Sequence, residues 1–341
     1  MENTIKDMFT NWLSNKGSGF SGVISASGAD GIIYQQASGY RNVSEAIPNM
    51  IDTAFGIASG TKLFTALAVC KLVDEKRLSL EDKLCDLLSY DLGQIDKRIT
   101  VFHLLTHTSG VGDYIDEDAE DGGEGQLQAL YDKYPVQLWT RLEYYLQMIT
   151  PLPPKFEPGQ RYGYSNSGFI LLGLVIEAVS GVPYQQYVQD AIIAPCGLIH
   201  TGYYPMDSLP ANVALGYMQD GDTDKLRTNI FSLPIIGGSD GGLFTCAGDL
   251  DTLWRAVFAN QIFSKKMTQS FLNFEKCGKT YGLGVYRNSR DGNVSYYAVG
   301  GDAGVDFFSA YFPQSKIVAS ALGNTNVNTF PLLNDLFEVL S

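Results

Sequence analysis

The chain has 341 residues, of which 45% are hydrophobic and 18% charged, a composition typical of a globular protein with a large core. Its formal net charge is −13 and it contains no run of Lys or Arg, which disfavours nucleic acids and anionic membrane surfaces as partners. No apolar run reaches the roughly 18–20 residues of a membrane span. We expect one compact protein with two closely packed lobes.

The N-terminal residues and the cysteines both indicate a reducing compartment. The first ten residues lack the basic and apolar regions of a secretory signal. The five cysteines are an odd number without close pairing, which favours free thiols over a disulfide framework. We therefore expect a cytoplasmic protein.

Strand patterns occupy both ends of the chain. Residues 20–27 and 32–40 are rich in β-forming residues and flank a plausible hairpin turn at 28–31. Four further runs near the C-terminus are separated by turn-forming residues, namely 281–287, 294–300, 305–312 and 317–322. Short connections favour antiparallel pairing, so we expect one sheet built from both ends.

The middle of the chain has mainly helical and loop patterns. Residues 61–76 carry apolar side chains on one helical face, and residues 169–179 form a nearly all-apolar helix with a glycine C-cap at Gly181. The last segment, 330–340, also has helical spacing. The acidic stretch 116–125 is predicted to be a mobile surface loop.

These patterns predict an α+β fold in which an antiparallel sheet is flanked by helices and interrupted by an inserted, mainly helical lobe. The sheet-and-helix lobe is expected to comprise residues 1–58 plus 276–341. The helical lobe is expected to comprise residues 59–275, and the two form a single unit.

Ser59 and Lys62 lie three residues apart at the expected start of a helix. Positions i and i+3 share a helix face, so the Lys62 amine can lie beside the Ser59 hydroxyl. A lysine kept neutral by burial can take a proton from serine, and a helix N-terminus offers N–H groups to an oxyanion. Taken alone, the pair also fits an N-cap serine followed by a surface lysine.

Tyr164 and Asn166 precede the apolar helix. In an extended loop, residues i and i+2 point the same way, so both side chains can face one cleft. A phenol can relay a proton, and an amide can hold a substrate carbonyl or a lysine amine.

Together with their surroundings, these motifs resemble those of the β-lactamase-related serine hydrolases. The superfamily includes class C β-lactamases, penicillin-binding proteins, and related esterases and D-aminopeptidases. The resemblance is carried by residues 20–65, 99–110 and 156–173 and extends over about 20–322. It implies a sheet flanked by helices with a helical lobe. It also implies a nucleophile at Ser59, a general base pair at Lys62 and Tyr164, and substrate or lysine contact at Asn166.

The third motif of this family, Lys-Thr-Gly or His-x-Gly, is where the sequence departs. The resemblance places Ala298, Val299 and Gly300 at the motif, so the cationic or imidazole side chain is missing. Its main-chain role is implied to survive, because the second oxyanion donor would be the N–H of Gly301. Lys276 and Lys279 lie one strand too early to replace the cation.

His103 and His107 are four residues apart, a spacing that can bind zinc on a helix. No Glu follows the first His and no third ligand is evident, and the resemblance instead places 107–110 at a structural turn. We expect neither a metal nor an organic cofactor.

Two functions are compatible with these observations. The first is a serine hydrolase that acts on an ester or amide of a small molecule or short peptide through an acyl-enzyme at Ser59, a β-lactam or D-amino acid peptide included. Among these, an esterase or a peptidase for uncharged or amino-terminal D-residues fits better than an efficient β-lactamase. The alternative is a catalytically weakened, penicillin-binding or sensor-like protein, which Ala298 supports.

Overall fold

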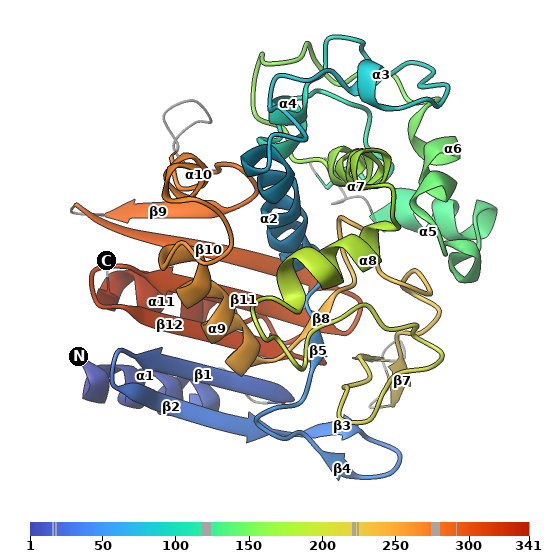
Figure 1. Cartoon of the computed structure of the whole chain (residues 1–341). Helices are drawn as coiled ribbons and strands as arrows, with labels where there is room; N and C mark the ends of the chain where they lie inside the picture. The colour runs from blue at the N-terminus through green and yellow to red at the C-terminus, as the bar shows by residue number, and fades with distance from the viewer. Residues whose placement is uncertain are drawn as a thin grey trace.

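A six-stranded antiparallel sheet forms the centre of one half of the molecule in the computed structural model (Figure 1). The structure describes residues 1–340 except 16, 18, 118–123, 220–222, 224, 274–279 and 291, and only the backbone of 124–128. The strand order β2-β1-β12-β11-β10-β9 joins the two chain ends, as the sequence predicted. The strands are β1 (Gly22–Gly28), β2 (Gly31–Ser38), β9 (Tyr286–Arg290), β10 (Asn293–Asp302), β11 (Val305–Phe312) and β12 (Ile317–Gly323).

Three short strand pairs lie outside this sheet: β3 (Tyr40–Asn42) with β4 (Ile47–Pro48), β5 (Phe55–Gly56) with β8 (Phe244–Thr245), and β6 (Tyr217–Gln219) with β7 (Leu226–Thr228). The β5–β8 pair is the one that bears on function, since β5 leads directly into the turn that contains Ser59.

Helices cover both faces of the sheet. On one face, α1 (Glu2–Asn15) and α11 (Phe330–Leu340) pack against each other and against β2 and β11. On the other face, α9 (Ala247–Phe258) packs on β12 and β1, and α10 (Lys265–Phe271) contacts α2 (Thr61–Asp74). Because β12 is covered on both sides, all of its residues are buried and its pattern is apolar rather than alternating.

The second half of the molecule is mainly helical (Figure 1). Its central helix, α7 (Asn166–Ser180), is buried from Asn166 to Ile176 and packs on α2 and α4 (Val101–Leu105). Its left-handed C-cap at Gly181, with φ of 81°, confirms the predicted helix end. The remaining helices are α3 (Leu84–Leu87), α5 (Glu124–Lys133), α6 (Leu146–Ile149) and α8 (Tyr184–Val188).

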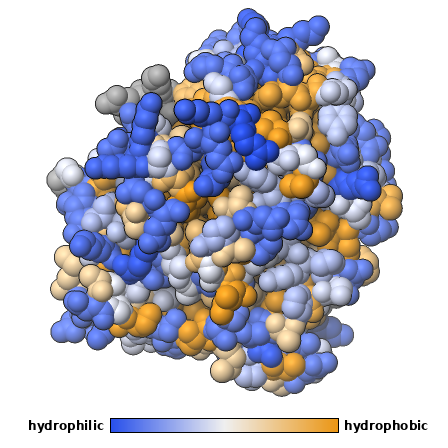
Figure 2. Space-filling view, viewed as in Figure 1, coloured by the Kyte–Doolittle hydropathy of each residue, from blue (hydrophilic) through white to orange (hydrophobic). Residues whose placement is uncertain are grey.

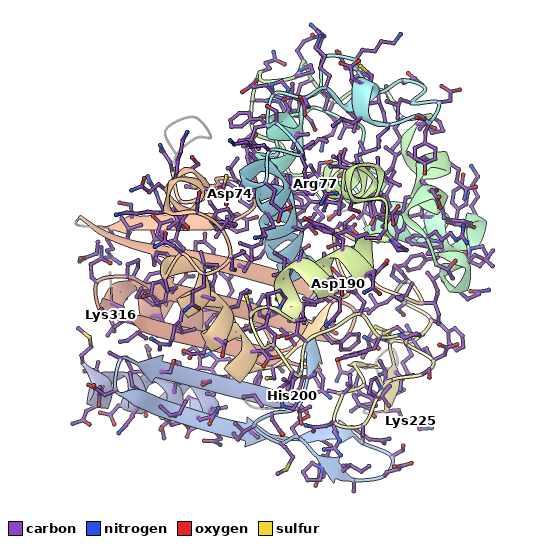
Figure 3. The ribbon with its side chains drawn as sticks, viewed as in Figure 1. Asp74, Arg77, Asp190, His200, Lys225 and Lys316 are labelled. Atoms are coloured by element: carbon purple, nitrogen blue, oxygen red, sulfur yellow. The ribbon has the colours of Figure 1, made fainter. Side chains whose placement is uncertain are left out.

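Polar contacts fix the far end of α2. The carboxylate of Asp74 accepts from the backbone N–H and the hydroxyl of Ser264, which caps α10. Arg77 donates to the carbonyl of Val179 at the end of α7. Figure 3 shows Asp74 and Arg77 at this junction. The helix that begins just after Ser59 is therefore anchored to both halves of the molecule.

One predicted strand differs from the structure, and one helix of the predicted helical lobe packs on the sheet. The predicted strand 281–287 was wrong in its first half: Tyr281 makes only an isolated bridge to Tyr286, and a turn around Gly284, with φ of 81°, precedes β9. The predicted division into lobes placed 247–258 in the helical lobe, whereas α9 packs on β1 and β12. The lobe boundaries themselves remain a prediction.

The face shown in Figure 2 is mostly hydrophilic, with hydrophobic residues in small separate groups. Among the described residues, no single helix is long and apolar enough to cross a membrane; 166–180 and 184–193 meet the criterion only as a pair bent by 76°.

Candidate active site

Ser59 lies in a tight turn between β5 and α2. The turn, Ala58–Gly60, is a short 3₁₀ segment, and α2 continues directly from it at Thr61. Ala58 has φ of 44°, a left-handed conformation that a residue with a side chain rarely adopts and that is frequent at functional sites. The chain therefore presents Ser59 at the start of a buried helix, as the sequence predicted.

Two side chains approach the hydroxyl of Ser59. Its Oγ lies 2.9 Å from Nζ of Lys62 and accepts a hydrogen bond of 2.8 Å from the hydroxyl of Tyr164. Lys62 follows on the same face of α2, whereas Tyr164 comes from the loop before α7, 105 residues away. The fold thus brings the two predicted proton-transfer groups to one oxygen.

The surroundings of Lys62 favour a neutral amine. Lys62 is 3% exposed, and burial lowers its pKa from the ordinary value, against the opposing pull of nearby Asp240, Glu117 and Asp113. Its Nζ donates to Oδ1 of Asn166 at 2.8 Å and to the carbonyl of Asp240 at 2.7 Å. A neutral amine has two N–H donors, so both are used, and its lone pair is left facing Ser59.

Burial shifts the pKa of Tyr164 in the opposite direction from that of Lys62. Burial, followed by the charge of Glu117, raises its pKa well above the usual value for a phenol. The phenol therefore stays protonated and donates to Ser59. This separates the two groups chemically: Lys62 is suited to accept the serine proton, and Tyr164 to donate or relay one.

Asn166 is fully engaged in holding this arrangement. Its Oδ1 accepts from Lys62, while its Nδ2 donates to Oε1 of Glu117 at 2.8 Å and to the carbonyl of Ile115. Of the two contacts the sequence suggested for Asn166, the one to the lysine amine is present.

Three acidic residues near Lys62 were missed by the sequence analysis. Asp113 accepts from the backbone N–H of Asn166 and Ser167 and so fixes the start of α7; burial raises its pKa to about 7. Glu117 lies in the stretch predicted to be a surface loop. Asp240, buried and with a pKa raised by that burial, accepts from the hydroxyl of Tyr114. The only sequence signal for Asp240 was an acid beside the Gly241-Gly242 pair.

Hydrogen bonds join the loop that contains Asp240 to α2. Thr65 donates to the carbonyl of Ser239, Lys62 donates to that of Asp240, and the N–H of Leu243 donates to Thr61. Three successive contacts therefore align this loop with the face of α2 that carries Lys62.

His103 and His107 have separate structural roles. His103 forms the capping box of α4 with Thr100. His107 is buried, accepts from the N–H of Ser165, and lies with its ring 4.5 Å from that of Tyr164; burial holds its pKa well below the usual value. Within the described ranges, no group of three or more His, Cys, Asp or Glu is placed to hold a metal ion.

Two cavities meet at Ser59 and Gly301. The larger, of about 740 Å³, is lined by Asn166 and by the carboxylates Glu117, Asp240, Asp302 and Asp306, among others. The smaller, of about 610 Å³, is lined by Lys62, Tyr164 and Ala298, and it shares Glu117 and Asp306 with the larger one.

The structure places Ala298, Gly300 and Gly301 on β10 beside the Ser59 turn. A Cβ on Gly300 would lie 2.2 Å from the carbonyl oxygen of Ile57 and 2.9 Å from the backbone nitrogen of Ser59, so only glycine permits this close approach. A Cβ on Gly301 would meet nothing within 4 Å. The backbone of β10 is thus in close contact with the backbone of the Ser59 turn.

Among the described residues that line either cavity, Lys62 is the one Lys or Arg. Three arginines that could have replaced the cation missing at Ala298 line neither cavity: Arg161, Arg227 and Arg287. Lys276 and Lys279, which the sequence analysis set aside, lie outside the described residues.

Comparison with known proteins agrees with this geometry. Residues 14–339 match the beta-lactamase family, so the chain belongs to that family, whose members are serine hydrolases. It is 29% identical over 285 residues to penicillin-binding protein 4* of Bacillus subtilis, covering 79% of this chain and 60% of the relative. The chain thus spans about three fifths of the length of curated relatives that it matches.

Solved structures share the whole fold. A penicillin-binding protein from Bacillus halodurans superposes with a TM-score of 0.87 at 37% identity, covering 99% of this chain and 100% of that one. A D-stereospecific amidohydrolase from Streptomyces sp. has a TM-score of 0.78 at 24% identity, covering 94% of each chain. These likenesses confirm the predicted α+β fold.

Proposed function

We propose that this protein hydrolyses an ester or amide through an acyl-enzyme on Ser59. The observation that carries the proposal is the position of Ser59 Oγ between Nζ of Lys62 and the hydroxyl of Tyr164, at the point where two cavities meet. A serine becomes a useful nucleophile when a neighbouring base can take its proton, and here a buried amine lies within 2.9 Å.

The groups present suffice for both halves of the reaction. Ser59 Oγ attacks the carbonyl carbon while its proton passes to Lys62, and the backbone N–H groups of Ser59 and Gly301 are proposed to stabilise the oxyanion. The proton then moves through Lys62 and Tyr164 to the leaving alcohol or amine as its bond to carbon breaks. Water, deprotonated by the same groups, cleaves the acyl-enzyme and restores Ser59.

The charges of the cavities favour substrates without a carboxylate. Four carboxylates line the larger cavity, and Ala298 supplies only a methyl group to the smaller one. The one Lys or Arg among the described residues that line the cavities is Lys62. Lys62 must be neutral to act as a base, so it cannot at the same time neutralise the charge of an anionic substrate. We therefore propose neutral or amino-bearing substrates.

The second candidate is a binding or sensing protein that has kept the fold. Ala298 supports it, since the family's cationic side chain is missing there. Against it stand the intact contacts of Lys62 and Tyr164 with Ser59, which a binding protein would not need.

The experiment that separates these functions is steady-state turnover of short-chain aryl esters, D-amino acid amides and a chromogenic cephalosporin by wild type and Ser59→Ala. We expect turnover of at least one ester or amide, abolished by Ser59→Ala. Absence of turnover across the panel by folded wild type would support the sensor instead.

A second prediction tests Ala298. The test uses two matched esters, one carrying a carboxylate substituent and the other the corresponding amide. A hydrogen bond to a charged group contributes about 1.5–3 kcal/mol, so wild type, which lacks the cation, should prefer the amide-bearing ester by about tenfold or more in kcat/KM. Ala298→Lys should recover part of the carboxylate activity. Wild type that prefers the carboxylate would show that another group fills the role of the missing cation.

A further inference from the structure

Several aromatic side chains line the smaller cavity beyond its proton-transfer groups, together with the carboxylates of Glu117 and Asp306. Besides Tyr164, this cavity is lined by Tyr162, Tyr281, Tyr286, Phe307 and Phe330. Tyr162 and Phe330 are 44% and 45% exposed, although most large aromatic residues of this chain are buried. The active-site cavity therefore has an open aromatic rim, contributed by the loop before α7 and by the start of α11.

The aromatic wall is held in place from behind. The ring of Tyr281 lies 4.7 Å from that of His107 and 4.6 Å from that of Tyr286. Tyr286 in turn stacks on Tyr297 at 5.1 Å with an interplanar angle of 17°. Since aromatic rings prefer such edge and offset contacts with one another, the wall is preorganised for a further ring.

The proton-transfer groups decide which part of a substrate occupies this cavity. Lys62 and Tyr164 line the smaller cavity, and neither is among the residues that line the larger one. A leaving group must receive its proton from a donor within hydrogen-bond reach as it departs. The leaving group therefore belongs in the smaller cavity, and the acyl group in the larger one.

We propose that the smaller cavity is a leaving-group subsite for a neutral aromatic alcohol or amine, whose ring packs against the aromatic residues of its rim, Tyr162 and Phe330. This inference rests on the proposed acyl-enzyme function. The inference extends that function, because it assigns the two halves of the substrate to the two cavities and names the chemistry of the leaving group. Ala298 contributes to the same selectivity by keeping a neutral surface on β10.

The test compares two esters of one acid, with benzyl alcohol and n-butanol as leaving groups of similar intrinsic reactivity. We expect wild type to prefer the benzyl ester by about fivefold or more in kcat/KM. The double variant Tyr162→Ala/Phe330→Ala should lose most of that preference, measured as the ratio of kcat/KM for the benzyl ester to that for the butyl ester. Phe231→Ala is the matched control, because Phe231 is 80% exposed and lines neither cavity.

A binding measurement separates failure of this inference from failure of the proposed function. N-benzylacetamide and N-butylacetamide are titrated into Ser59→Ala, with and without the double substitution, and followed by NMR. Preferential binding of the benzyl compound, lost in the double variant, supports the subsite even if wild type turns over no ester. Equal binding of the two compounds, or an unchanged benzyl-to-butyl ratio in the variant, would overturn it.

Discussion

At the scale of single residues, burial assigns different tasks to Lys62 and Tyr164. It lowers the pKa of the amine and raises the pKa of the phenol, so in both groups burial favours the neutral form. The sequence predicted both residues and their meeting at Ser59. It left the division of roles open, because the burial that shifts the two pKa values arises only in the folded structure.

Glu117 offers a direct test of this assignment through pH. The carboxylate raises the pKa of Lys62, so Glu117→Gln should lower that pKa while its side-chain oxygen can still accept from Asn166. Under the proposed mechanism, activity requires the neutral amine and rises with pH through the pKa of Lys62. The acid limb of the kcat/KM profile should therefore move to lower pH in the variant.

Glu75→Gln is the control for this experiment. It removes an equal charge just beyond the far end of α2, where Glu75 pairs with Lys71, and it should leave the acid limb in place. An acid limb that moves to higher pH in Glu117→Gln, or not at all, would show that Lys62 does not control it.

At the scale of elements, the approach of β10 to the Ser59 turn is the contact on which the site depends. Gly300 permits it, since any Cβ there would collide with backbone atoms of Ile57, Ser59 and Gly60. Backbone atoms cannot move aside as a flexible side chain can, so a methyl group at this position must displace the strand or the turn.

Gly300→Ala should therefore reduce kcat/KM by about 100-fold or more while the protein stays folded, because small displacements of reacting groups are costly. Gly301→Ala adds the same methyl group one residue later, where it meets nothing within 4 Å, and should cost less than about tenfold. Steady-state kinetics and circular dichroism provide the measurement. Equal effects of the two substitutions would contradict the role given to this contact.

The elements that the sequence predicted best are those with an uninterrupted pattern. The predicted strand 305–312 and helix 330–340 coincide with β11 and α11. The segment 281–287 combined β-forming residues with Gly284, whose φ of 81° places a turn before β9. Helix α1 was not predicted, although Ile5, Phe9 and Trp12 form the buried stripe of an amphipathic helix.

At the scale of the whole molecule, the active site exists only because two halves of the chain meet. Ser59 follows β5 next to the sheet, Tyr164 comes from the helical half, and Gly301 lies at the end of β10. The order of the motifs predicted the family and its fold. The two cavities and their linings could not be predicted, since residues far apart in the sequence form each wall.

The central claim is that this assembly activates Ser59. The most direct measurement is labelling of the native protein with a fluorophosphonate probe, followed by peptide mapping. We predict one covalent label, on Ser59, that is absent from Ser59→Ala, strongly reduced in Lys62→Ala, and lost when the wild type is denatured before the probe is added. A label on another residue, or a folded wild type that takes up none, would contradict the account.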